Sequence, residues 1–106
     1  MADLELIAIS GDFDEASLAR HGKRVEAALS AGSKKLVLNL KGVRFVDSSA
    51  LGFLVETQRR LKEGGGALAV SEPSKFVRGV IASLGLDRVF GVFASDDDAR
   101  RRLEGP

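Results

Sequence analysis

Hydrophobic and polar positions along the chain alternate between short apolar runs and longer stretches that carry helical signals. The apolar runs are typical of strands and cover residues 4–10, 35–40, 67–70 and 88–93. The stretches with helical spacing or helix caps cover about 15–30, 49–62, 74–84 and 95–103. Strand and helix therefore alternate four times with short connections. This order predicts an α/β fold with a four-stranded, mostly parallel sheet.

Local signals refine these boundaries. The run KLVLNL (35–40) is nearly continuous in apolar residues, which is typical of a central strand covered on both faces. Gly11-Asp12 predicts a turn after the first strand, and Asp14 is the expected N-cap of the first helix. Pro73 suits the first turn of the third helix, and Ser95 is the expected cap of the last.

Composition and charge narrow the functional class. The chain has 106 residues, 44% of them hydrophobic, which suits a single domain spanning 1–106. A net charge of +1 gives none of the basic excess of nucleic-acid binders. The sequence has no cysteine and no apolar run of about 20 residues that could span a bilayer. Acidic residues near its start argue against a signal peptide. We therefore expect a cytoplasmic protein that binds neither nucleic acid nor membrane.

The stretch RFVDSSALGFLVETQRRLKEGGG (44–66) carries the candidate chemistry. At 100° per residue, Ala50, Leu51, Leu54, Val55 and Leu61 share the face expected to meet the sheet. The opposite face carries Ser49, Gly52, Glu56, Arg60 and Glu63. Phe53 lies at the margin of the outer face, and Ser48 lies toward the buried face. The pattern predicts that the Ser49 hydroxyl reaches solvent and that Ser48 has a structural role.

A simple structural role competes with a chemical one. Asp47, Ser48 or Ser49 could each be the N-cap of the helix. Gly52, however, costs about 1 kcal/mol relative to alanine inside a helix and leaves bare backbone beside Ser49. A phosphate on Ser49 would add roughly −1.5 to −2 charges. The helix N-terminus tolerates this anion, whereas a partner docked over Gly52 and Phe53 would be repelled.

The segment LVLNLKGVRFVDSSALGFLV resembles the signature of STAS domains, particularly of bacterial anti-sigma factor antagonists. SGDFDEASL resembles the turn of this family before its first helix, and the later strand-helix units also match, so the similarity covers about residues 4–103. The resemblance implies a sheet with helices packed mainly on one face. It also implies a protein without enzymatic activity or cofactor, which acts by binding other proteins.

The resemblance further implies a partner and a switch. The partner is an anti-sigma factor that is also a serine kinase of the histidine-kinase-like ATPase fold. It phosphorylates the second serine of the Asp-Ser-Ser motif, here Ser49, and the complex separates until a serine phosphatase resets it. The partner-binding residues expected from the pattern and the resemblance are Asp14, Asp47, Ser48, Ser49, Gly52, Phe53, Glu56 and Arg60.

Two departures from the family keep an alternative open. At most three residues precede the first strand, where the family usually has another strand, so the sheet could have an open edge. Ala50 also stands where the switch proteins often have glycine. The alternative is a non-switching STAS scaffold or accessory subunit of a stressosome-like or lipid-transport complex. A third interpretation is an enzyme or a nucleotide-binding protein. His21 is the one histidine of the sequence, so a metal site is not expected.

Overall fold

The computed structural model describes residues 3–105, and its element order follows the predicted alternation. The strands are β1 (Leu4–Phe13), β2 (Lys35–Val46), β3 (Ala67–Ser71) and β4 (Gly91–Phe93). The α-helices are α1 (Glu15–Ser30), α2 (Ser48–Glu63), α3 (Lys75–Ser83) and α4 (Asp96–Glu104). A 3₁₀-helix, η1 (Leu86–Arg88), lies between α3 and β4.

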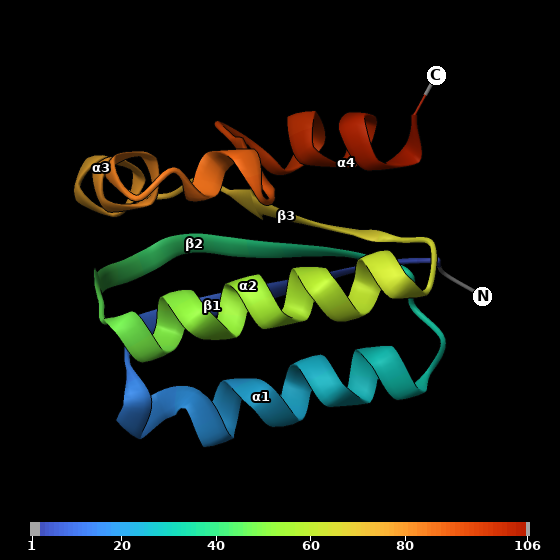
Figure 1. The fold of residues 1–106 in the computed structure, drawn as a ribbon, viewed down its shortest axis with the longest axis horizontal. Helices are drawn as coiled ribbons and strands as arrows, with labels where there is room; N and C mark the ends of the chain where they lie inside the picture. The colour runs from blue at the N-terminus through green and yellow to red at the C-terminus, as the bar shows by residue number, and fades with distance from the viewer. Residues whose placement is uncertain (1–2, 106) are drawn as a thin grey trace.

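The four strands form one sheet in the order β1-β2-β3-β4. All three strand pairings are parallel, so the predicted α/β class is confirmed and the described sheet contains no antiparallel strand. Each crossover from one strand to the next contains a helix, as parallel neighbours require. The carboxyl ends of the strands consequently share one edge of the sheet, and α1, α2 and α3 all begin at that edge (Figure 1).

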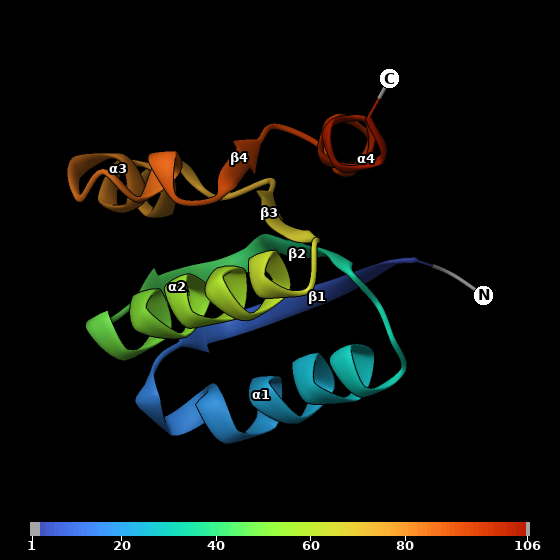
Figure 2. The same ribbon diagram turned by 45° about the vertical axis from the view of Figure 1, so that its right-hand side comes forward.

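The helices are divided unequally between the two faces of the sheet, as expected. Leu36, Leu38 and Leu40 of β2 belong to the main core, which includes buried residues of α1, α2 and α3. Val37 points the other way and packs with Ala99 of α4. Figure 2 shows α4 on the opposite side of β3 and β4 from α3. The continuous apolar run in β2 is therefore explained by burial on both faces.

The first two strands extend beyond their predicted ends. Gly11-Asp12 does not form a turn after β1, because pairing with β2 continues to Phe13 through two register shifts. Gly11 has a φ of +82°, which glycine adopts without strain, so it forms an irregularity inside the strand. The extension brings Phe13 opposite Val46. As a result, α1 and α2 start from neighbouring positions.

The later boundaries also differ in detail from the prediction. The predicted strand over 88–93 is wrong in its first half, because Gly85 adopts a left-handed conformation and is followed by η1. β4 is therefore only three residues long. Pro73 lies before α3 rather than in its first turn, because Ser74 is the N-cap of that helix. Ser95 caps α4 as predicted, with its hydroxyl accepting the Asp98 backbone N–H at 3.0 Å.

A small polar cluster fixes α4 to the sheet. Asp96 Oδ1 accepts hydrogen bonds from Asn39 Nδ2 at 2.8 Å and from Ser71 Oγ at 2.5 Å. Ser71 is fully buried, so this carboxylate satisfies a hydroxyl that would otherwise lie unpaired in the interior. The three residues come from β2, β3 and α4, and they set the position where α4 begins.

β1 is an outer strand of the described sheet, and part of its free side is occupied. Arg24 of α1 donates from Nη1 to the Ala8 carbonyl at 2.6 Å. The Asp3 carbonyl points toward β2, because it accepts the backbone N–H groups of Lys34 and Lys35. Carbonyl groups of successive residues in a strand point to alternate sides, so the carbonyl of Ala8 points away from β2. The expected open edge is therefore partly covered by a side chain of α1.

Candidate functional site

The N-termini of α1 and α2 meet around a single carboxylate, that of Asp47. Its Oδ1 accepts the Ala50 backbone N–H at 2.9 Å and thereby caps α2. Its Oδ2 accepts the Glu15 backbone N–H at 3.0 Å, in the first turn of α1. The N-cap of α2 is therefore Asp47 rather than Ser48 or Ser49. One side chain holds the first turns of two helices.

Asp14 has the predicted capping role on α1. Its side chain accepts the Ser17 backbone N–H at 3.1 Å, and the Ser17 hydroxyl accepts the Asp14 backbone N–H at 3.1 Å. This reciprocal capping box satisfies two backbone donors that the helix cannot pair internally. Asp14 and Asp47 thus lie at the adjoining starts of α1 and α2.

Ser49 and Ser48 do not divide between solvent and core as the wheel predicted. Ser48 is exposed, whereas Ser49 is half-buried, and its hydroxyl donates to Glu15 Oε1 at 3.4 Å. The prediction that Ser48 lies toward the buried face is wrong, because Ser48 is exposed. Ser48 is the first residue of α2, and an ideal wheel does not describe which segments cover the first turn of a helix. Ser49 instead faces the start of α1 and remains partly accessible.

The charges around Ser49 are acidic. Asp14, Glu15 and Asp47 lie at the paired helix starts, and Glu15 contacts the Ser49 hydroxyl directly. The hydrogen bond from the Ala50 N–H lowers the pKa of Asp47 below its ordinary value, with a smaller contribution from the Glu15 N–H. Asp47 therefore stays ionised near neutral pH. Two helix N-termini favour a further anion here, whereas the carboxylates oppose one.

Gly52 and Phe53 have different surroundings. Gly52 is exposed, and a Cβ built on it would meet nothing within 4 Å. Phe53 is half-buried, and its ring packs edge-on against Phe13 with ring centroids 6.1 Å apart. A Cβ built on Gly22 of α1 would lie 3.9 Å from the Phe53 ring. Phe53 therefore serves mainly as a contact between α2 and the core, while Gly52 presents open backbone.

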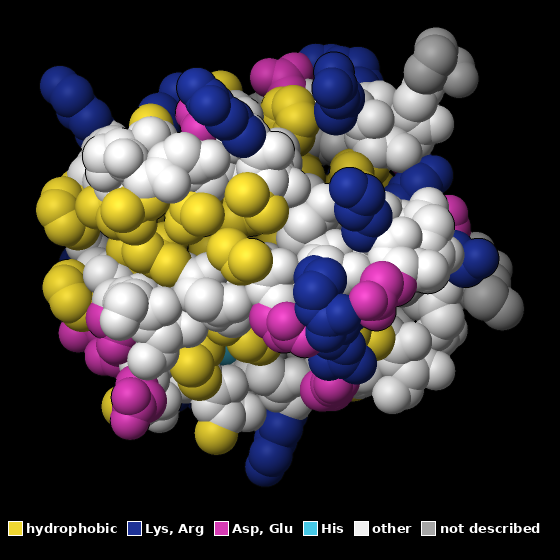
Figure 3. Space-filling model, in the orientation of Figure 1, with side chains coloured by type: hydrophobic (Ala, Val, Ile, Leu, Met, Phe, Trp, Pro, Cys, Tyr) yellow, Lys and Arg dark blue, Asp and Glu magenta, His cyan; other side chains and the backbone are white. Residues whose placement is uncertain are grey.

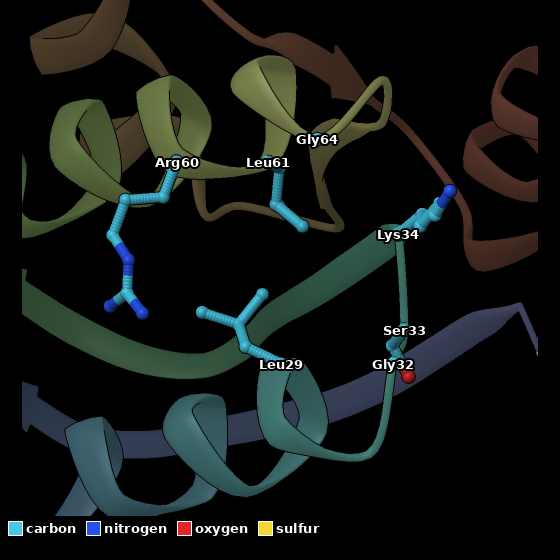
Figure 4. A pocket seen from close by; sticks show the side chains of 7 residues that line it. All are labelled: Leu29, Gly32, Ser33, Lys34, Arg60, Leu61 and Gly64. Carbon is cyan, nitrogen blue, oxygen red and sulfur yellow. The ribbon is translucent and has the colours of Figure 1, made fainter.

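Glu56 and Arg60 lie farther along α2 and are engaged in ion pairs. Glu56 pairs with Arg59, and Arg60 Nη1 lies 2.7 Å from Glu26 Oε1 of α1. Figure 4 shows Arg60 reaching from α2 toward α1, beside a hollow whose lining includes Leu29 and Leu61. Arg60 lies eleven positions after Ser49, about 16 Å along the helix. The structure therefore does not bring Arg60 to the Ser49 end of the site.

An exposed apolar surface lies next to the site and was missed by the sequence analysis. Figure 3 shows hydrophobic side chains gathered over α3 and the adjoining start of α2. On α3, Phe76 is 57% exposed and Leu84, at its C-cap, is 60% exposed. Val80 lies between them and is half-buried, so the four-residue spacing places all three on one side. We call Phe76, Val80 and Leu84 the α3 stripe. Its four-residue spacing is visible in the sequence, but spacing alone does not show that this side of the helix is exposed.

Other chemistry is limited in the described part of the chain. Residues 3–105 contain no group of three or more histidine, cysteine or acidic side chains that could hold a metal ion. No helix among these residues is long and apolar enough to cross a bilayer. His21 is buried, and its Nδ1 has no partner in the part of the chain that the structure describes. Burial, together with Arg20 and Arg24, lowers its pKa. It packs against Phe13 within the core rather than facing the site.

Comparison with known proteins agrees with this arrangement. The anti-sigma F factor antagonist of Paenibacillus polymyxa is 24% identical over 100 residues, covering 93% of this chain and 86% of the relative. An anti-sigma factor antagonist candidate from Thermotoga maritima superposes with a TM-score of 0.90 at 23% identity, covering 99% of this chain and 91% of that chain.

The antagonist SpoIIAA superposes in two states. Its unphosphorylated form gives a TM-score of 0.79 at 24% identity, covering 97% of this chain and 90% of that chain. The phosphorylated form of the Bacillus protein gives 0.72 at 22% identity, covering 96% and 92%. At these identities the superpositions establish the fold alone. The model of the STAS domain family, however, matches residues 3–99, nearly the whole chain. The chain therefore belongs to the STAS domain family.

Proposed function

We propose that this protein is an anti-sigma factor antagonist, a non-enzymatic cytoplasmic regulator controlled by phosphorylation of Ser49. Its partner is an anti-sigma factor serine kinase of the histidine-kinase-like ATPase fold, and a serine phosphatase reverses the modification. The names of its relatives support the general role. The observation that carries the switch is the Ser49 hydroxyl, partly accessible and 3.4 Å from Glu15 where two helices begin.

The chemistry of the switch is a single phosphoryl transfer. The Ser49 oxygen attacks the γ-phosphorus of ATP bound to the kinase, the bond to the ADP oxygen breaks, and the serine proton is released. The phosphatase later hydrolyses the phosphoserine to serine and inorganic phosphate. This chain supplies only the acceptor hydroxyl and the surface that positions it. Exposed Gly52, three residues away, leaves room for close approach of the partner.

Electrostatics explains how the phosphate would release the partner. Phosphoserine carries roughly −1.5 to −2 charges and would lie among Glu15, Asp14 and Asp47. The exposed Glu15 side chain can swing away, and the helix N-termini stabilise the anion, so the domain stays folded. A partner surface matched to a neutral serine would instead meet uncompensated negative charge and dissociate.

The α3 stripe supplies the apolar part of the proposed contact. Phe76 and Leu84 are each more than half exposed, so a partner can bury both without disturbing the core. Large exposed apolar groups beside a polar site are typical of protein interaction surfaces. We therefore place the docking surface over the start of α2 and the α3 stripe.

The experiment that tests the proposal is phosphorylation by the cognate kinase, followed by intact-mass and peptide mass spectrometry. The expected result is one added phosphate, on Ser49. Ser48→Ala is the matched control, since Ser48 is the more exposed neighbour. Ser48→Ala should be phosphorylated normally, Ser49→Ala should bind the kinase without modification, and Ser49→Asp should bind poorly. Phosphate that persists on Ser49→Ala would show that the assignment is wrong.

A further inference from the structure

Three carboxylates lie with Ser49 at the paired helix starts, and the structure holds them in different ways. Asp47 accepts backbone N–H groups at both of its oxygens, at 2.9 and 3.0 Å, and Asp14 accepts one at 3.1 Å. These two carboxylates are therefore fixed by capping bonds. The Glu15 side chain is exposed, and its only hydrogen bond within residues 3–105 comes from the Ser49 hydroxyl.

The capping bonds also occupy backbone donors that would otherwise hold a phosphate. Helix N-termini bind anions through their unpaired N–H groups. At the start of α2 the Ala50 N–H donates to Asp47, and in the first turn of α1 the Glu15 N–H donates to the same carboxylate. The bond from Ala50 contributes most to the lowered pKa of Asp47, which stays ionised and keeps both donors. A phosphate on Ser49 would gain the field of the two helices without these two hydrogen bonds.

Glu15 lies where that phosphate would otherwise go. Ser49 Oγ is 3.4 Å from Glu15 Oε1, and the hydroxyl proton is directed between the two oxygens. Phosphorylation replaces this proton with a phosphoryl group, for which the space between the two oxygens leaves no room. Two negative groups at this separation also disfavour the ionisation of one another. The phosphate and the Glu15 carboxylate must therefore move apart.

We propose that Glu15 is a positioning residue of the switch, whose carboxylate turns the phosphate on Ser49 outward from the helix starts. This inference rests on the proposed phosphorylation of Ser49. Exposed Gly52 lies one turn later on α2, so a phosphate turned away from α1 stands on the proposed docking surface. The added charge then faces the partner and is not absorbed by the caps.

The test uses protein with phosphoserine incorporated genetically at position 49, so that no kinase is needed to produce it. Phosphoserine titrates at about pH 6, and ³¹P NMR follows this step. We expect the pKa of the phosphate to be higher with Glu15 than in Glu15→Gln, which keeps the size of the side chain and removes its charge. Glu15→Asp should retain most of the rise. If Glu15 only supported the first turn of α1, none of these variants would change the phosphate pKa.

The matched control is Glu5→Gln, because Glu5 is an exposed glutamate at the other end of β1. It should leave the phosphate pKa unchanged. Couplings between the α- and β-protons of phosphoserine report its rotamer directly. They should show one dominant rotamer with Glu15 and averaging between rotamers in Glu15→Gln. An equal phosphate pKa in these two proteins, an equal effect of Glu5→Gln, or an unchanged rotamer would each overturn the inference.

A binding measurement separates this inference from the proposed function. The affinity of the cognate kinase is compared between unmodified and phosphorylated protein, with Glu15 and with Glu15→Gln. Removing one exposed charge should reduce the ratio of the two affinities roughly two- to fivefold. An unchanged ratio would remove Glu15 from partner release. A kinase that bound neither form would contradict the proposed function, whereas the phosphate pKa and rotamer would still decide the role of Glu15.

Discussion

The ring of His21 meets the ring of Phe13 edge-on, with the ring centroids 5.6 Å apart. His21 is only 2% exposed, and its Nδ1 has no hydrogen-bond partner among residues 3–105. A charged imidazole is therefore disfavoured here, and burial lowers the pKa of His21 below 6.5, assisted by Arg20 and Arg24. His21 is therefore a neutral core residue of α1, and it contacts Phe13, the last residue of β1.

The first prediction concerns stability between pH 7 and pH 5. Because the folded pKa of His21 is depressed, the unfolded chain binds the proton more readily once the pH falls below about 6.5. The free energy of unfolding should therefore decrease from pH 7 toward pH 5. Urea unfolding at several pH values measures this slope. His21→Leu should flatten the slope, and an unchanged slope in that variant would assign the effect to another group.

A second prediction concerns the shared cap. Asp47→Ala removes acceptors from the first turns of both α1 and α2, so it should lower the free energy of unfolding more than Asp47→Asn, which keeps one acceptor oxygen. The contribution of the carboxylate should also be lost at acidic pH, as the pH falls through the depressed folded pKa of Asp47. Chemical denaturation measures both effects.

The control for the shared cap is Asp12→Ala. Asp12 is exposed on β1 and its side chain makes no hydrogen bond within the described residues. Its replacement should leave stability nearly unchanged. If Asp12→Ala lowered the free energy of unfolding as much as Asp47→Ala, the effect would come from removing any negative charge near the helix starts rather than from the two capping hydrogen bonds.

Gly52 gives a prediction in which stability and binding change in opposite directions. Its added methyl group would meet open space, so Gly52→Ala should stabilise the isolated domain by about 1 kcal/mol. The same methyl group should weaken kinase binding if the partner approaches the bare backbone closely. Thermal unfolding and a titration with the kinase measure the two effects. Tighter or unchanged binding would remove Gly52 from the proposed docking surface.

Gly66 provides a comparison, because packing at this position requires a glycine. A Cβ on Gly66 would lie 1.6 Å from the Lys34 carbonyl oxygen, where β3 begins beside β2. Gly66→Ala should therefore destabilise the fold by roughly 1–3 kcal/mol or more, because backbone must move. The contrast with Gly52 separates a glycine required by packing from one that leaves a surface open.

The α3 stripe provides a test of the docking surface. Phe76→Ser and Leu84→Ser each remove an exposed side chain, so stability should change little. If these residues are central to the contact, each substitution should weaken kinase binding by tenfold or more. Val89→Ser is the control, an exposed apolar residue outside the stripe. Equal losses in all three variants would indicate a nonspecific effect of surface polarity.

The element order was predictable from the sequence because each helix carries its own cap and each strand its own apolar run. The ends of β1 and β2 were not predictable. Gly11 has a positive φ typical of a turn, but it lies inside β1, where the pairing with β2 continues through register shifts. Asp14 and Ser95 are local caps and were identified correctly. The second bond of Asp47 joins residues 32 positions apart, so no local pattern could reveal it.

The exposure of the serines required tertiary information as well. A helical wheel does not show which neighbouring segments cover a helix, and Ser48, placed toward the buried face by the wheel, is exposed at the start of α2. On α3 only Val77 and Ile81 are buried, whereas Phe76 on the same helix is exposed. Periodicity identifies faces but does not show how many of them are covered.

The hydrogen bond from Arg24 to the Ala8 carbonyl has a consequence for behaviour at high concentration. A β-strand from a neighbouring molecule that approached this side of the sheet would meet a fixed cation where it needs an acceptor. Edge-to-edge aggregation is therefore disfavoured by one side chain. This arginine therefore helps the folded protein stay dispersed as its concentration rises.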